Sequence, residues 1–169
     1  STLMRSSAAS DVYKRQVLGE EEQALAWSGT TPFKDIEKGS QAEHYVGYAY
    51  EKGYTNGYTA TSFKPAGAVN AYQYTEFVLR AMGYSSAANK DLSDTLLRAV
   101  NAGVLTDGDT AMLQSAAFLR AQLVYISYYA LEADLPDGSQ SLADRLMDLG
   151  VFTRDEWRGS WKLVKSEHL

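Results

Sequence analysis

The chain has 169 residues, a net charge of −5 and no cysteine, and it is long enough to bury a core as one domain or as a compact array. The acidic balance argues against nucleic-acid binding, which needs a basic surface, and the lack of cysteine excludes disulfides and thiolate metal sites. No stretch approaches the ~20 apolar residues of a membrane span, so membrane insertion is not expected.

The first 16 residues differ in character from the rest. Residues 11–16 read Asp-Val-Tyr-Lys-Arg-Gln, which matches an in-frame translation of a transposase end used to build sequencing libraries. The Ser- and Ala-rich stretch before them has no structural period and lacks the apolar core of a secretory signal. We predict that residues 1–16 are a disordered, non-native artefact and that residues 17–31 form a leading helix and linker.

The next part of the chain predicts a short helix followed by a long one. The short helix is expected over 42–52 and ends at a glycine. A turn sequence follows it, and the long helix is expected over 69–82, where apolar residues recur at helical spacing on one face. Five of the 12 tyrosines lie between Tyr45 and Tyr58. Tyrosine suits contacts with sugars as well as half-buried packing in a helix.

The same plan recurs with changes further along. A short helix is expected over 91–102, a turn at 106–109, a long helix over 116–133 and another short helix over 142–149. The sequence Thr153 to Glu156 is typical of a capping box that opens a last short helix. No stretch alternates with a period of two, so an all-α fold is predicted.

Three of these segments end alike, with a half-apolar helical turn that runs into glycine and then a hydrophobic residue. The glycines are Gly53, Gly103 and Gly150, which lie 50 and 47 residues apart. Glycine just past a helix end is the usual left-handed cap. A near-constant period of this size is typical of repeat proteins. We therefore predict tandem helix-loop-helix repeats packed as a small helical bundle.

In their order along the chain, these residues resemble the S-layer homology domain family. The likeness in the first unit is carried by Phe33-Lys-Asp-Ile36, Gly53-Tyr54, Gly57, Phe63-Lys-Pro65 and the run from Val69 to Tyr84.

In the second unit, Leu119-Arg-Ala-Gln122 resembles the family's Thr-Arg-Ala-Glu/Gln signature. The third unit resembles only the first half of a repeat. The resemblance places repeat 1 at 32–87, repeat 2 at 88–135, and a partial repeat 3 with a tail at 136–169.

The resemblance implies a non-catalytic module that attaches exported proteins to the wall, outside the bacterial cell. Family members bind an anionic, often pyruvylated, secondary cell-wall polysaccharide in grooves between repeats. The signature arginine supplies a bidentate contact to a carboxylate, which lysine does not reproduce. Arg120 is therefore the first candidate for polymer binding, and Asp35, Gln122 and Arg154 are further candidates.

The sequence departs from the family pattern at the signature. Asn70-Ala71 stands where the family has Thr-Arg, and Leu119 replaces the capping threonine. Arg120 is equally consistent with a surface ion pair, Asp35 with a cap for the segment after it, and Arg154 with an ordinary surface role. The alternative function is a degenerate repeat module that serves as a structural spacer or binds other surface proteins.

Enzyme chemistry has little support. His44 and His168 are the only histidines, and neither lies at a metal-ligand spacing. The segment Thr106 to Asp109 lacks the spacing of a calcium-binding loop. No catalytic residue, cofactor or metal site is predicted, and the chain is not expected to be an enzyme.

Overall fold

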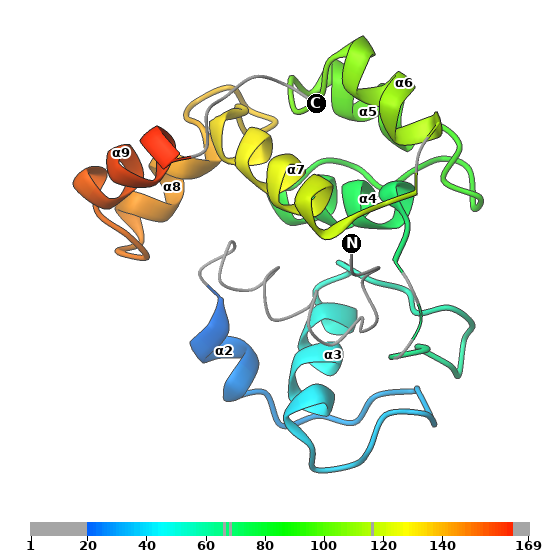
Figure 1. The fold of residues 1–169 in the computed structure, drawn as a ribbon. Coiled ribbons are helices and arrows are strands. Elements are labelled where there is room, and N and C mark those ends of the chain that lie inside the picture. Colours follow the sequence, from blue (N-terminus) through cyan, green and yellow to red (C-terminus); the bar gives the residue numbers. More distant parts are fainter. Residues whose placement is uncertain (1–19, 66, 68, 116, 164–169) are drawn as a thin grey trace. The chain divides into compact units, whose positions relative to one another are not determined.

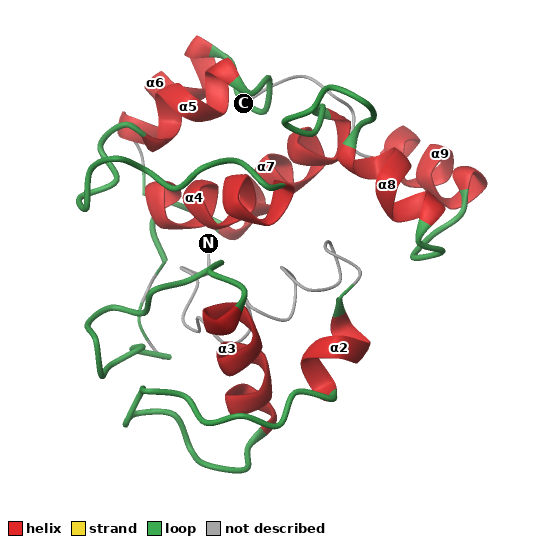
Figure 2. Cartoon of the chain, turned by 180° about the vertical axis from the view of Figure 1, so that it is seen from behind, coloured by secondary structure: helices red, strands yellow, loops and turns green. Residues whose placement is uncertain are grey.

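The structure is a computed structural model that describes residues 20–163 apart from 66, 68 and 116. The described residues form eight α-helices and no sheet (Figures 1 and 2), which confirms the all-α prediction. The predicted artefact at 1–16 lies outside the described residues. The chain divides into two compact units, with the boundary between Asn70 and Ala71.

The first unit contains helices α2 (Glu21–Leu25) and α3 (Gln41–Glu51), which pack against each other. The Ser40 hydroxyl caps α3 by accepting the Glu43 N–H at 3.1 Å. Gly47 lies in the middle of α3, where a Cβ would overlap the Trp27 ring. A glycine inside this helix is therefore explained by the close approach of an indole ring.

The core of the first unit is small and largely aromatic. Phe33, Ile36 and Val46 are buried together, and Phe63 packs against them from the long loop after α3. The Phe33 ring lies 5.2 Å from the Tyr50 ring, edge to face, and 5.5 Å from the Phe63 ring. These ring geometries add to the free energy gained by burial. The long loop is thereby tied to α3.

The second unit contains six helices in its described part. They are α4 (Ala71–Met82), α5 (Thr95–Asn101), α6 (Asp107–Ser115), α7 (Arg120–Glu132), α8 (Leu142–Asp148) and α9 (Arg154–Leu163). Helix α4 packs against α5 and α7, α7 against α8, and α5 against α6. Residues of the predicted apolar faces, among them Tyr74, Met82 and Ile126, are fully buried.

A buried carboxylate connects α4 to α5. Glu76 is 3% exposed, and its two oxygens lie 2.8 Å from Arg80 Nε and 2.5 Å from Arg98 Nη1. They also accept the Ala87 N–H at 2.8 Å and the Thr95 hydroxyl at 3.0 Å. Burial alone raises the pKa of Glu76, but these hydrogen bonds outweigh it and lower the pKa. The carboxylate is therefore ionised and fully bonded.

The glycine caps are confirmed. Gly53, Gly103 and Gly150 have φ of 75°, 74° and 75°. In each case the N–H of the next residue bonds back to the carbonyl five residues before it, as Val104 does to Ala99 at 2.9 Å. This is the Schellman arrangement, and it satisfies carbonyls that a helix end leaves open.

The predicted turn at 106–109 is wrong, because this segment opens helix α6. The Thr106 N–H donates to the Asp109 carboxylate at 2.7 Å, and the Asp109 N–H donates to the Thr106 hydroxyl at 3.2 Å. The two residues thus form a reciprocal capping box, with aspartate in place of the usual glutamate. The Gly108 between them suggested a turn from sequence.

Helix α5 also begins later than predicted. Leu92 has φ of 61°, and the Asp91 carboxylate accepts the Ser93 N–H at 3.1 Å. This local bond favours a turn over a helix. The helix therefore starts only at Thr95.

Candidate polymer-binding site

The signature positions mark helix starts in the structure. Helix α4 begins at Ala71, α7 at Arg120 and α9 at Arg154 (Figure 1). The first N–H groups of a helix have no partner within it, and the helix dipole places partial positive charge there. An arginine at this point adds a full charge and a planar fork, which suits an anion. Two of the three helix starts carry that arginine.

The Gln122 side chain contacts other residues of the protein at the start of α7. Its side-chain oxygen accepts the Leu119 N–H at 2.7 Å, and its Nε2 lies 2.9 Å from Met112 Sδ. Gln122 is only 7% exposed. The Leu119 side chain has no acceptor for the Gln122 N–H, so only one of the two hydrogen bonds of a capping box forms. The placement of the Arg120 side chain lies outside the described part of the structure.

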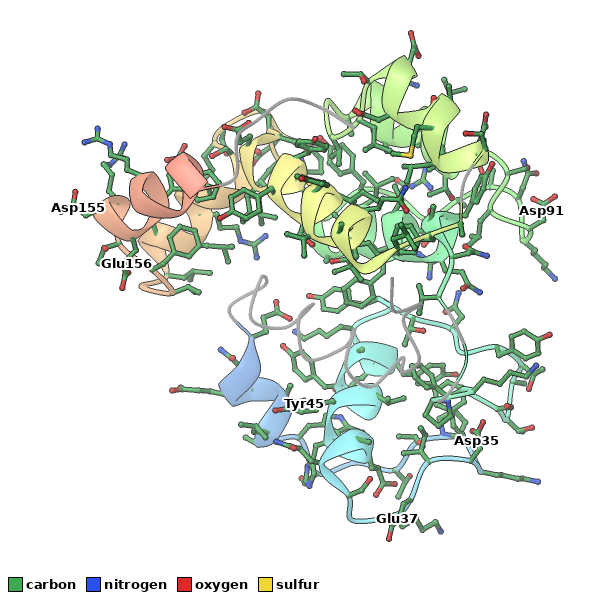
Figure 3. The ribbon with its side chains drawn as sticks, in the orientation of Figure 1. Asp35, Glu37, Tyr45, Asp91, Asp155 and Glu156 are labelled. Carbon is green, nitrogen blue, oxygen red and sulfur yellow. The ribbon has the colours of Figure 1, made fainter. Side chains whose placement is uncertain are left out.

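The start of α9 has a complete capping box. The Glu156 carboxylate accepts the Thr153 N–H at 2.7 Å, and the Glu156 N–H donates to the Thr153 hydroxyl at 3.2 Å. The bond from the Thr153 N–H lowers the pKa of Glu156. Figure 3 shows Glu156 on this helix. The predicted cap is confirmed.

Arg154 follows this cap and faces solvent. Its side chain is 67% exposed, and Nη2 lies 3.9 Å from an oxygen of Asp144, which is 48% exposed. An exposed pair at that distance contributes little to stability. Arg154 is therefore available to an anion that reaches this helix start.

Asp35 holds a distant loop rather than the segment after it. Its carboxylate accepts the Ser62 hydroxyl and the N–H groups of Phe63 and Lys64, each at 2.8 Å. Figure 3 labels Asp35 in the first unit. The bond from the Phe63 N–H is the largest of the effects that lower the pKa of Asp35 to about 2. The Asp35 carboxylate thus fastens the loop after α3 through these three hydrogen bonds.

The family comparison matches the segment that contains Asp35 and the loop it holds. Residues 32–70 match the family model of the S-layer homology domain. This segment belongs to the S-layer homology family. The matched stretch includes Asp35, helix α3 and the loop with Phe63, and it ends directly before α4. Comparison with curated proteins and with solved structures gives no significant match.

S-layer homology domains are in general non-catalytic modules that anchor proteins to the cell wall or cell surface. The acidic and histidine side chains in the described residues do not gather into a group of three or more that could hold a metal ion. None of the described helices combines the length and apolar character needed to cross a membrane.

The candidate residues predicted from the sequence differ in their surroundings. They are Arg120, Gln122, Arg154 and Asp35. Arg154 is exposed at a helix start, whereas Gln122 and Asp35 are engaged within the protein. Sequence reasoning did not single out Tyr58 and Lys64. The Lys64 ammonium lies 3.5 Å from the centroid of the exposed Tyr58 ring. The cluster of tyrosines was the signal that could have found this pair.

Proposed function

We propose that this chain anchors a protein to the bacterial cell wall by binding an anionic secondary cell-wall polysaccharide. The observation that carries the proposal is that three helices begin at the signature position, in a chain with an S-layer homology segment. Arg120 and Arg154 are the proposed contacts at two of these starts. The protein then acts outside the cell, at the wall.

The chemistry of a helix start favours this ligand. The open N–H groups and the dipole attract a carboxylate, and the guanidinium holds both of its oxygens. Gln122 supports Arg120 indirectly, because its bond to the Leu119 N–H fixes the first turn of α7. Asp35 acts in the same way on the loop after α3. The binding groups are then positioned before the polymer arrives.

The test is retention of the protein on purified cell-wall sacculi, before and after extraction of the secondary polymer. We expect retention to fall in the order wild type, Arg120→Lys, Arg120→Ala, because lysine keeps the charge but loses the planar fork. The matched control is Arg158→Ala, which removes an exposed arginine from the interior of α9. Equal retention of wild type and Arg120→Ala would reject Arg120 as the anchor.

A second candidate is a degenerate module that acts as a spacer or binds other surface proteins. It is favoured by Ala71, which leaves α4 without the signature arginine. The internal bonds of Gln122 point the same way. This function predicts that retention on sacculi is weak and does not change when the polymer is extracted.

A further inference from the structure

Residues 20–27, which come before the family segment at 32–70, lie along α3 as a strap. The strap consists of α2 and the residues that flank it, and it packs on α3 within the first unit (Figure 1). Ala24 is fully buried, whereas Leu25 is 44% exposed and Trp27 is half-buried. A segment that buries so little apolar surface can open at low cost while the rest of the unit stays folded.

Trp27 attaches one end of the strap to α3. A Cβ added to Gly47 of α3 would overlap the indole ring, and so would a Cβ added to Gly29. The two glycines thus leave the room that the ring occupies. The indole Nε1–H donates to the Glu51 carboxylate at 2.7 Å, and the Trp27 carbonyl accepts a hydrogen bond from His44 Nδ1.

Glu20 attaches the other end. The Tyr54 hydroxyl lies 3.0 Å from each oxygen of the Glu20 carboxylate and donates to it. Glu20 also accepts a hydrogen bond from the Tyr48 hydroxyl. Tyr48 belongs to α3, and Tyr54 follows the glycine cap of that helix. A carboxylate therefore takes part in the attachment at each end, Glu20 from the strap and Glu51 from α3.

The closed strap brings negative charges together. Burial is the largest of the effects that raise the pKa of Tyr48 to about 12, and the charges of Glu20 and Glu51 add to it. Both carboxylates thus act on the same phenol. Glu22 adds a further exposed negative charge on the strap. The Lys52 ammonium, 5.5 Å from the centroid of the Tyr48 ring, offsets only part of this charge.

We propose that residues 20–27 are a salt-responsive strap, which is closed over α3 at high ionic strength and opens more often at low ionic strength. The Debye length is about 8 Å at 0.15 M salt and about 30 Å at 0.01 M, so salt weakens the repulsion between Glu20 and Glu51. The fit of the Trp27 ring against Gly47 does not depend on charge. Opening uncovers the face of α3 around Gly47. The strap does not depend on which polymer the protein binds.

The test is hydrogen exchange of the full chain, followed by NMR at about 0.01 M and about 0.15 M sodium chloride. The probes are the Trp27 indole Nε1–H and the Ala26 N–H, which donates to the Glu22 carbonyl at 2.9 Å. The N–H of buried Val46 in α3 is the internal reference. We expect the strap probes to exchange about threefold faster at low salt, relative to Val46, because exposed charges of this kind interact weakly.

Two variants separate charge from hydrogen bonding. Glu20→Gln and Glu51→Gln each keep an acceptor for the strap but remove a charge. In both, the ratio between the two salt concentrations should fall from about threefold toward one. A purely structural hydrogen bond would instead change exchange equally at both concentrations. Glu37→Gln removes an exposed carboxylate from the loop before α3 and is the matched control, which should keep the wild-type ratio.

Gly47→Ala tests the seat of the indole without changing a charge. The added Cβ should displace the ring and speed exchange of the Trp27 indole N–H about tenfold at both salt concentrations, while Val46 stays protected because alanine favours the helix. The strap is overturned if its probes exchange only as fast as Val46, if wild type shows no salt dependence, if both glutamine variants keep the wild-type ratio, or if Gly47→Ala leaves Trp27 unchanged. None of these outcomes involves sacculi, so they do not bear on the wall-anchor function.

Discussion

At the residue scale, the three cap glycines are held by backbone conformation alone. Gly53, Gly103 and Gly150 have positive φ, and a Cβ added at any of them meets no atom within 4 Å. Any penalty for a larger residue there comes from the left-handed backbone rather than from a clash. This makes the caps a direct test of the repeat boundaries.

Gly103→Ala should lower the free energy of unfolding by about 1 kcal/mol, because alanine is strained at positive φ. The measurement is chemical denaturation followed by circular dichroism. Gly108→Ala is the matched control, since Gly108 lies inside α6 without a positive φ and has only an ordinary contact at 3.7 Å. It should gain about 0.5–1 kcal/mol from helix propensity. A loss in both variants would contradict this explanation.

Asp35 predicts a pH dependence at the same scale. Its pKa falls from the ordinary 3.8 to about 2 on folding. A lowered folded-state pKa stabilises the protein at pH values above 3.8 and loses that contribution as the pH falls toward about 2. An NMR titration of the Asp35 carboxyl should therefore show a midpoint near 2, with the signals of Phe63 and Lys64 following it. A midpoint near 3.8 would mean that the hydrogen bonds from residues 62–64 to the Asp35 carboxylate do not form in solution.

At the scale of elements, α4 and α5 are joined by charge as well as by apolar packing. Glu76 carries the negative charge for Arg80 and Arg98 while it also accepts bonds from Ala87 and Thr95. An ion pair of this kind gives little net stability against a well-packed apolar replacement. The removal of one partner is costly, because the other charges stay partly buried.

Glu76→Gln should therefore lower the free energy of unfolding by about 2–3 kcal/mol, less than for a fully buried pair because the arginines can reach water. Urea denaturation measures the change. Glu37→Gln removes an exposed carboxylate from the first unit and should stay within about 0.5 kcal/mol of wild type. If Glu76→Gln is equally neutral, the cluster is not what connects α4 to α5.

The short helices show how local bonds decide element boundaries. Thr106 and Asp109 turn a polar, glycine-containing stretch into the start of α6. The Asp91 carboxylate delays the start of α5 through the Ser93 N–H. Asp109 and Asp91 are both acidic and both lie near a helix start, but Asp109 favours the helix whereas Asp91 delays it. The difference is which N–H lies within reach of the carboxylate, and this depends on the backbone path.

At the scale of the whole molecule, the proposed polymer contacts lie at two helix starts, Arg120 of α7 and Arg154 of α9. A polymer that binds at two points of one protein gains from the high effective concentration of the second contact. Arg120→Ala and Arg154→Ala should each reduce retention on sacculi about fivefold to tenfold, and the double variant should lose more than either. Retention of the double variant at the level of one single variant would show that only one arginine takes part.

The helical class, the cap glycines and the capping box at Thr153 could all be predicted from the sequence, because they depend on bonds between residues no more than five apart. It also carried the family pattern of the first repeat, which the match at 32–70 confirms over that segment. The apolar spacing of α4 predicted its buried face correctly, since a helix repeats on a short and fixed period.

Which polar side chains form hydrogen bonds within the protein could not be predicted without the packed fold. Asp35 bonds to residues 27 to 29 positions away, and Tyr74 shares a 2.6 Å hydrogen bond with Ser127, 53 positions along the chain. Partners at such separations depend on how the elements pack, and no local pattern encodes them. For the same reason the sequence does not show that the Lys64 ammonium lies over the Tyr58 ring. The direction of the Lys64 side chain depends on its left-handed backbone, and the Lys64 N–H donates to Asp35, which is 29 positions away in the chain.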